Sequence, residues 1–170
     1  DGVVAMVTGG SSGCGREIAC ALPVWGWAIV IVYLEDQPTA DATVAEILAA
    51  EGNVVAVRAD LADELDVQRL FAESSAAFSG VDVIVPHAGW TTGGLAGAGA
   101  SAMSRDQACD HVQKLIDLAR RENPDVICLA HGGPISGPAD TRFLYEHTDA
   151  QGFLGASSVG TQDGQSRPPG

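Results

Sequence analysis

Short apolar runs alternate with helix-like segments along almost the whole chain, and this alternation constrains the fold more than any other feature. Six runs read as strands, at residues 3–7, 28–34, 54–59, 81–85, 126–130 and 152–159. These runs are almost continuously apolar, which is typical of strands that helices cover on both faces. The alternation therefore predicts an α/β fold, with a parallel sheet between two layers of helices.

The segments between the strands carry apolar residues at helical spacing, and several have recognisable ends. Helices are expected at residues 13–22, 41–51, 63–78, 104–123 and 138–147, with Asp63 as a cap and with a capping box formed by Ser104 and Gln107. Right-handed crossovers and a change of direction after the third strand predict the strand order 3-2-1-4-5-6 of an open, Rossmann-like sheet. We expect one domain over residues 1–159 and a disordered tail over residues 160–170.

The loop between the first strand and the first helix reads T-G-G-S-S-G-C-G, at residues 8–15. In a phosphate-binding loop, Gly9 would permit the tight turn, Gly13 would let a pyrophosphate approach the backbone, and Gly15 would let the helix pack closely on the sheet. The free N–H groups and the dipole of the helix start would attract the anion. The alternative is a plain strand-to-helix turn that only needs glycine, but the flanking strand and helix favour the phosphate site.

Charge and composition exclude several classes of partner. The chain has 22 Asp and Glu against 9 Lys and Arg, a net charge of -13, so we expect neither nucleic acid nor an anionic membrane as a partner. No apolar run approaches the roughly 18 residues of a membrane span, and no targeting signal is apparent. Four cysteines without a C-x-x-C pair indicate reduced thiols and a cytoplasmic protein. A zinc site from Cys128, His131 and His87 lacks ligand spacing, so no metal is predicted.

Residues 3–85 resemble the N-terminal half of the short-chain dehydrogenase/reductase family. The loop matches that family's T-G-x-x-x-G-x-G motif, and Asp60-Leu61 matches its acidic contact to the adenine ring. Residues 33–36, Y-L-E-D, stand where the family selects NAD or NADP, and their two carboxylates slightly favour NAD. The resemblance implies a dinucleotide site made by Thr8, Gly9, Ser11, Ser12, Gly13, Gly15, Glu35, Asp36, Asp60 and Leu61.

The chain then departs from this family. Residues 86–89 read P-H-A-G where the family has N-N-A-G, and no Tyr-x-x-x-Lys follows. Tyr33 and Tyr145 are the only tyrosines, and the residues four positions after them are Gln37 and Asp149. Hydride transfer in the family needs the acidic tyrosine and its lysine, so their absence predicts that the usual proton donor is missing.

Residues 81–159 resemble a second family, the phosphoenolpyruvate-hydrolase-like TIM-barrel proteins. The resemblance rests on three blocks, V-D-V-I-V-P-H-A-G-W-T-T-G-G, N-P-D-V-I-C-L-A-H-G-G-P and G-F-L-G-A-S-S. It implies that ligand-binding strand ends are lined by His87, residues 91–94, residues 131–133 and residues 155–158. A barrel needs eight strand–helix units, and only about three of its strands are present here.

Together these features lead us to expect a recombined or engineered chain, with a dehydrogenase-like half over residues 1–85 and a barrel-derived half over residues 86–159. A first residue other than Met points the same way. The main expectation is a scaffold without a complete active site that is not an enzyme and binds NAD or NADP weakly. One alternative is an NAD(P)-dependent oxidoreductase with His87 or His131 as the acid. The other is a binder of phosphate or carboxylate ligands that uses the barrel-derived loops.

Overall fold

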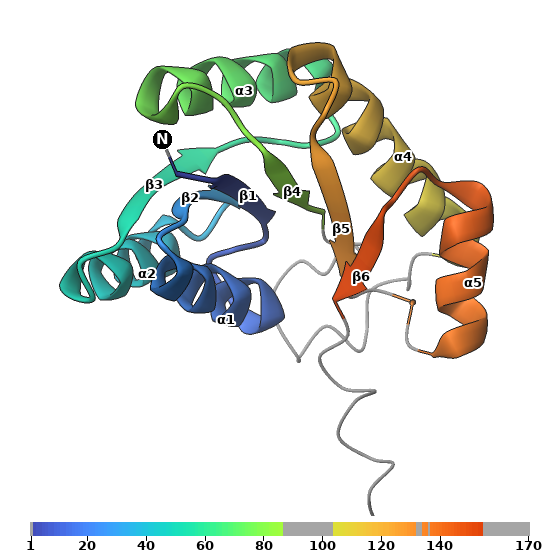
Figure 1. Cartoon of the computed structure of the whole chain (residues 1–170), viewed down its shortest axis with the longest axis horizontal. Coiled ribbons are helices and arrows are strands. Elements are labelled where there is room, and N and C mark those ends of the chain that lie inside the picture. Colours follow the sequence, from blue (N-terminus) through green and yellow to red (C-terminus); the bar gives the residue numbers. More distant parts are fainter. Residues whose placement is uncertain (1, 87–103, 132–133, 136, 155–170) are drawn as a thin grey trace, which may run out of the picture.

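The computed structural model describes residues 2–86, 104–131, 134–135 and 137–154. Six parallel strands form one sheet in the order β3-β2-β1-β4-β5-β6, as predicted (Figure 1). The strands are β1 (Val4–Thr8), β2 (Ala28–Tyr33), β3 (Asn53–Arg58), β4 (Val83–Val85), β5 (Ile127–His131) and β6 (Gly152–Leu154). The helices are α1 (Gly13–Ala21), α2 (Gln37–Ala49), α3 (Glu64–Phe78), α4 (Arg105–Glu122) and α5 (Pro138–His147), with a short 3-10 helix η1 (Leu22–Trp25) after α1.

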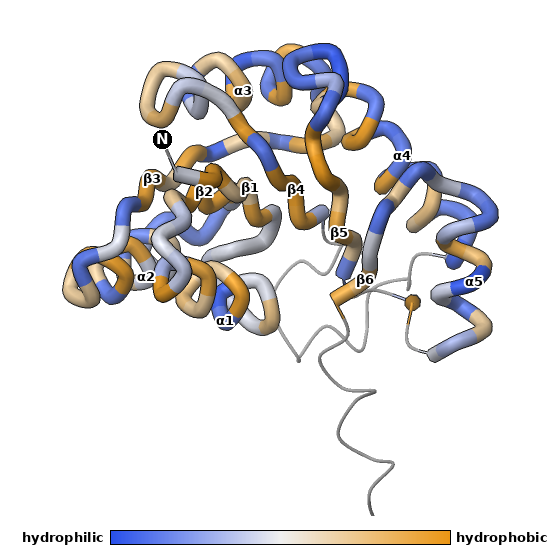
Figure 2. The backbone as a smooth tube through the Cα atoms, in the orientation of Figure 1, coloured by the Kyte–Doolittle hydropathy of each residue, from blue (hydrophilic) through white to orange (hydrophobic). Residues whose placement is uncertain are grey.

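Helices cover the two faces of the sheet in two groups. α1 and α2 lie on one face, and α3, α4 and α5 lie on the other (Figure 1). Right-handed crossovers require this division, because the chain moves outward from β1 to β3 and then returns to add β4 on the other side of β1. The central strands are accordingly the most hydrophobic of the described elements, while much of α4 is hydrophilic (Figure 2).

The core divides into two clusters, because successive side chains of a strand point to opposite faces. Ala5 and Val7 of β1 belong to the cluster that faces α1 and α2, together with Ile47 of α2. Met6 belongs to the opposite cluster, together with Ile116 of α4. All five residues of β1 are buried, so this strand forms the centre of both clusters.

Two features of the fold differ from expectation. α2 begins at Gln37 rather than at residue 41, because the Asp36 side chain accepts a hydrogen bond from the backbone N–H of Thr39 and caps an earlier turn, which contains Pro38. η1 was not expected, and it ends at Gly26 with a left-handed φ of 77°. The last part of the sixth predicted strand, residues 155–159, and the predicted tail lie outside the described residues.

A core substitution tests the role of α4. Ile116 is fully buried, whereas Ile127 of β5 is 46% exposed. We expect Ile116→Ala to lower the free energy of unfolding by about 2–5 kcal/mol, because it removes buried methyl groups and leaves a cavity. The matched control Ile127→Ala should lower it by less than half as much, because much of that side chain stays in water. Urea denaturation measures both, and equal losses would contradict the packing described.

Candidate functional site

The loop between β1 and α1 turns through two left-handed glycines. Gly9 has a φ of 63° and Gly13 a φ of 52°, a region that glycine enters without the steric cost that a Cβ imposes. The backbone N–H of Gly9 donates to the carbonyl oxygen of Val32 at 3.0 Å, which ties the loop to the end of β2. The loop is therefore held against the carboxyl edge of the sheet.

Gly15 makes the close approach of α1 to the loop possible. A Cβ at this position would overlap the carbonyl oxygen of Gly9, with the Gly9 carbonyl carbon 2.8 Å away. No side chain fits there without moving the backbone. The role predicted for Gly15, close packing of the helix, thus has a direct steric basis.

The start of α1 offers backbone N–H groups to an anion. Ser12 occupies the N-cap position, but its side chain makes no capping hydrogen bond, and the first turn has no acidic residue. A Cβ at Gly13 would meet no atom of the described residues within 4 Å, so these residues leave the space beside it open. A helix N-terminus carries roughly half a positive charge, so this open space suits a phosphate group.

Two buried hydroxyl-bearing residues hold the loop in place. The Thr8 hydroxyl donates to the carbonyl oxygen of Val85 at 3.4 Å, joining the ends of β1 and β4. The hydroxyl of Thr43, a fully buried residue of α2, shares its one hydrogen between the carbonyl oxygens of Thr39 at 3.0 Å and Ser11 at 3.4 Å. Thr43 was not predicted from the sequence, because nothing in its local pattern shows that α2 packs on the loop.

Two carboxylates follow β2, and the structure gives them different surroundings. The Asp36 side chain accepts from the Thr39 hydroxyl at 2.6 Å and from the Thr39 N–H at 3.1 Å. These hydrogen bonds, the hydroxyl first, hold the pKa of Asp36 below its ordinary value. Asp36 is thus engaged as a helix cap, whereas Glu35 is exposed at the same edge.

Asp60 follows β3 and is held by a network that sequence reasoning missed. Its Oδ1 accepts from the N–H of Ala62 at 2.9 Å, and its own N–H donates to Oδ2 of Asp66 at 2.9 Å. Arg69 donates to Asp66 at 2.9 Å and to the carbonyl oxygen of Arg58 at 2.7 Å. The N–H of Asp60 and then Arg69 lower the pKa of Asp66. The Asp66–Arg69 spacing of three residues was the one available signal.

The predicted site residues thus meet along one edge of the sheet. The glycine loop follows β1, Glu35 and Asp36 follow β2, and Asp60 follows β3, with β2 paired to both neighbours. Strands are about 4.8 Å apart, so these ends span about 10 Å. Leu61 is half-buried and packs against the core. The strand order reverses beside β1, because β2 and β3 lie on one side of it and β4, β5 and β6 lie on the other. Open α/β sheets form a ligand crevice at such a point.

The other side of the crevice is formed by the ends of β4 and β5. His131 ends β5 and is 2% exposed, and its backbone N–H donates to the carbonyl oxygen of Pro86 at 3.0 Å. Of the ligand-lining residues that the second resemblance implies, only His131 is described; residues 91–94, 132–133 and 155–158 lie outside the described residues. His87, which the imagined zinc site needs, also lies outside them, and no cluster of three potential metal ligands occurs within the described ranges.

Cys128 does not supply a reactive thiol to the described site. All four cysteines are free thiols. Cys128 of β5 is buried, and this burial raises the pKa of its thiol to about 11. Such a thiol stays protonated and unreactive at neutral pH.

Two family models match overlapping parts of the chain. The KR domain model matches residues 3–107, and the phosphoenolpyruvate hydrolase-like model matches residues 60–161. Each match covers more than half of the chain. The chain belongs to both families.

Similar proteins of both kinds are known. The chain is 42% identical over 88 residues to the 3-oxoacyl-[acyl-carrier-protein] reductase of Synechocystis, which covers 52% of this chain and 36% of the reductase. It is 44% identical over 84 residues to the ToMV susceptible protein tm-1(GCR26) of Solanum lycopersicum, which covers 49% of this chain and 11% of that protein. The chain therefore spans about a third of the reductase and about a tenth of the tomato protein.

Solved structures of short-chain dehydrogenases share the fold. The enzyme of Serratia marcescens superposes with a TM-score of 0.64 at 25% identity, over 86% of this chain and 64% of that one. A short-chain dehydrogenase of Burkholderia cenocepacia in complex with NADP gives 0.62 at 25% identity, with the same coverage. One of Burkholderia phymatum in complex with NAD gives 0.59 at 26% identity, over 77% of this chain and 49% of that one.

These matches correct the expectation of a recombined scaffold that is not an enzyme. The two family matches overlap over residues 60–107 and so do not meet at one junction near residue 85. The KR model continues past that junction, and the reductases that match are named oxidoreductive enzymes. The resemblance to both families is confirmed, but an engineered or recombined origin is not supported.

No helix within the described ranges is long and apolar enough to cross a membrane.

The Asp66 network makes stability depend on pH. The pKa of Asp66 in the folded chain lies below its ordinary value of 3.8, so its stabilising effect is complete above that pH and is lost as the pH falls through the folded-state pKa. Asp66→Asn keeps an acceptor for Asp60 but cannot titrate. We expect wild type to be more stable than Asp66→Asn at pH about 6, and the difference to shrink by pH about 3. Urea denaturation across this range measures it, and a constant difference would contradict the network.

Proposed function

We propose that this chain is an oxidoreductase of the short-chain dehydrogenase type that binds a nicotinamide dinucleotide at the carboxyl edge of its sheet. One observation carries the proposal. Gly13 is left-handed, and no described residue fills the space beside its Cα. It stands at the start of a helix whose N-cap side chain makes no hydrogen bond to the helix N–H groups. The residues therefore fit a pyrophosphate. The named complexes of similar dehydrogenases with NAD and with NADP support the same cofactor class.

The arrangement of the strand ends gives the dinucleotide its direction. With the pyrophosphate at the loop after β1, Asp60 after β3 would hold the adenine and Glu35 after β2 would hold the ribose. The nicotinamide half would then fall to residues at the ends of β4 and β5. Glu35 and Asp36 repel a 2′-phosphate and favour NAD, although Arg58, which donates to the carbonyl oxygen of Leu34 at 2.9 Å, places one cation at this edge. This binding need not be weak, because the expectation of weak binding rested on the supposed scaffold.

The bound dinucleotide would supply or accept the hydride, and the chain's own residues must bind, orient and move a proton. The proton donor must stand on the nicotinamide side of the crevice. Among the described residues at the carboxyl ends of β4, β5 and β6, namely Pro86, His131 and Leu154, only His131 can carry a proton. Both of its ring nitrogens are buried, so a substrate reaches them only if the structure opens locally beside the ring. In the proposed reaction a ring nitrogen of His131 donates the proton to the carbonyl oxygen of the substrate.

A glycine pair tests the cofactor site. Gly13→Ala should weaken NADH binding at least tenfold, which corresponds to about 1.4 kcal/mol, because the added methyl group occupies the space for the pyrophosphate. Gly26→Ala is the matched control: Gly26 also has a positive φ and open space beside it, but it lies at the end of η1. Both variants therefore meet the same backbone strain. Calorimetric titration with NADH, NADPH and AMP measures binding, and equal affinities for both variants would refute the site.

A histidine pair tests the chemistry. The reductase relatives suggest a 3-oxoacyl thioester as the carbonyl substrate, and acetoacetyl-coenzyme A with NADH is the probe. His131→Ala should lower kcat by about 100-fold or more while leaving the Kd for NADH unchanged, and added imidazole should restore part of kcat. His147→Ala, at an exposed position on α5, should keep full activity. Unchanged turnover in His131→Ala would exclude His131 as the proton donor.

A further inference from the structure

The turn between α1 and β2 exposes two large apolar side chains to solvent. Val24 is 85% exposed and Trp25 is 77% exposed, the highest values among the large hydrophobic side chains of the described residues. The two residues are neighbours in η1, which ends at Gly26 with a φ of 77°. Neither side chain contributes to the core, so their exposure calls for a reason other than folding.

A third exposed apolar side chain belongs to the same end of the molecule. Pro23 of η1 packs against Gly52, where an added Cβ would lie 3.0 Å from the Pro23 Cβ. Leu48, four residues before Gly52 in the last turn of α2, is 55% exposed. We call the three exposed side chains, Val24, Trp25 and Leu48, the η1 surface. Apolar side chains gathered at one exposed place are typical of a site of protein contact.

The layer that carries the η1 surface is acidic. Residues 17–57 contain no Lys, Arg or His, and they contain six carboxylates, namely Glu17, Glu35, Asp36, Asp41, Glu46 and Glu51. Arg16 precedes this stretch, and its guanidinium is already bound by Glu17 at 3.0 Å and by Glu46. Glu51 is exposed, its N–H donates to the carbonyl oxygen of Leu48 at 3.0 Å, and it makes no ion pair within the described ranges. The η1 surface therefore combines apolar side chains with negative charge that no cation neutralises.

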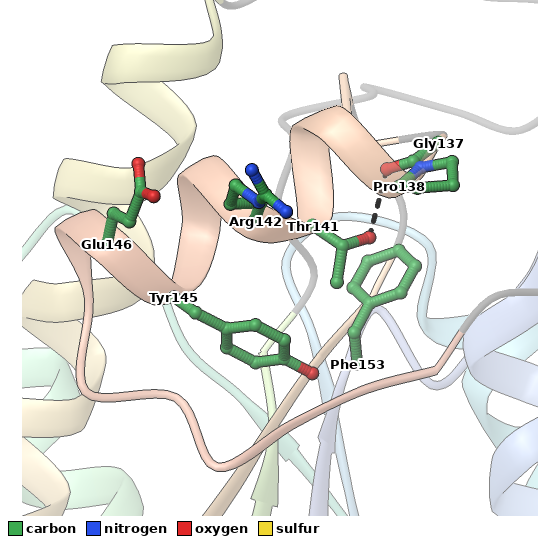
Figure 3. A pocket seen from close by; sticks show the side chains of 7 residues that line it. All are labelled: Gly137, Pro138, Thr141, Arg142, Tyr145, Glu146 and Phe153. Atoms are coloured by element: carbon green, nitrogen blue, oxygen red, sulfur yellow. Dashed lines mark hydrogen bonds between the residues drawn. The ribbon is translucent and has the colours of Figure 1, made fainter.

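Another exposed aromatic region differs in charge. The hollow between α5 and β6 is lined by Tyr145 and Phe153 but also by Arg142 (Figure 3). Apart from Arg16, every Lys and Arg of the described residues lies between residues 58 and 142, at the end of β3 or on α3, α4 and α5. These three helices cover the opposite face of the sheet from α1 and α2 (Figure 1). The charge that surrounds the η1 surface is thus of one sign.

We propose that the η1 surface docks a cationic amphipathic helix of another protein. The apolar side of that helix covers Val24 and Trp25, and its Lys and Arg side chains face Glu51. Tryptophan is enriched among the residues that dominate such contacts, because it buries a large and rigid surface. The proline of η1 and its packing on Gly52 hold Trp25 in place before the partner arrives, so little order is lost on binding.

Charge separates this occupant from others. A second copy of the chain would bring the same carboxylates and a net charge of -13, so it would be repelled. Nucleic acid and anionic membranes would be repelled for the same reason. A cationic helix is attracted by the field that repels these partners.

The η1 surface lies apart from the proposed cofactor site. η1 leads into the start of β2, whereas the glycine loop follows the end of β1, and the two strands are parallel. The docked helix therefore lies at the opposite edge of the sheet from the dinucleotide, and its binding does not depend on the proposed oxidoreductase activity.

A synthetic probe tests the proposal. It is an amphipathic peptide of Leu and Lys, about 15 residues or four helical turns long, and its control is a peptide of the same composition with the Leu residues spread around the helix. Calorimetric titration of the full chain should show one-to-one binding of the amphipathic peptide, and binding of the control about tenfold weaker or more. The fluorescence emission of Trp25 should shift to shorter wavelength as the peptide covers it. No binding of the amphipathic peptide at about 1 mM would overturn the proposal.

Matched variants separate the apolar contact from the overall charge. The double variant Val24→Ser/Trp25→Ser should bind the amphipathic peptide about tenfold more weakly or less, whereas Leu65→Ser, at a 73% exposed position on α3, should bind as wild type does. Glu51→Lys should weaken binding about threefold. Glu122→Lys makes the same change of net charge at an exposed position of α4 and should have a smaller effect.

Two results with these variants would contradict the docking site, and circular dichroism checks that each variant is folded. Equal affinities of wild type and Val24→Ser/Trp25→Ser would show that charge alone binds the peptide. Self-association of wild type with rising concentration, measured by sedimentation equilibrium and abolished in the same double variant, would assign the η1 surface to a second copy of the chain.

Discussion

The pairing of β1 with a strand on each side is the constraint on which the rest of the structure depends. Five registered pairs join β1 to β2, and three join it to β4. At the start of β1, the N–H of Val4 donates to the carboxylate of Asp82 at 2.8 Å, and at its end the Thr8 hydroxyl reaches Val85. Because the helices that follow β1 and β3 leave on opposite faces, the crevice opens above β1 and cannot form elsewhere along the sheet.

The cofactor site proposed here attracts an anion with backbone dipoles rather than with cationic side chains. Arg16 is the cation nearest the loop in sequence, but its guanidinium is bound by Glu17 at 3.0 Å and by Glu46 of α2. The net charge of the chain opposes an anionic ligand. The helix start and the open space beside Gly13 must therefore supply the attraction over a short range. In the proposed site the geometry of the three glycines would therefore matter more than the surrounding charge.

The sheet could be predicted from the sequence because each strand can be recognised from its own residues. The β-branched run of β2 predicts a strand, and the glycines after β1 predict a turn. Right-handed crossovers then allow one strand order. The site could be predicted only in part. Thr43 and Arg69 act through contacts that exist only after α2 and α3 have packed, so no local pattern contains them.

The error about function had a different cause. The absence of Tyr-x-x-x-Lys predicts that the usual proton donor is missing, and the resemblance to two families predicts two joined pieces. The overlap of the two family matches over residues 60–107 shows that α3 and β4 satisfy both patterns. A buried parallel strand between two helices needs the same apolar pattern in an open sheet and in a barrel. Strand patterns alone therefore do not distinguish the two folds.

The hydrogen bond between Val4 and Asp82 also bears on how the chain reaches its fold. It joins residues 78 positions apart, whereas Val4 pairs with Ala28 on its other side. Closing a loop about three times longer costs about 1 kcal/mol more in chain entropy. The sheet of β1, β2 and β3 can therefore assemble from near contacts first, and the crevice above β1 exists only once β4 has arrived. The ligand site is thus completed by the later of the two pairings, and a chain released before β4 has formed has the glycine loop but no crevice.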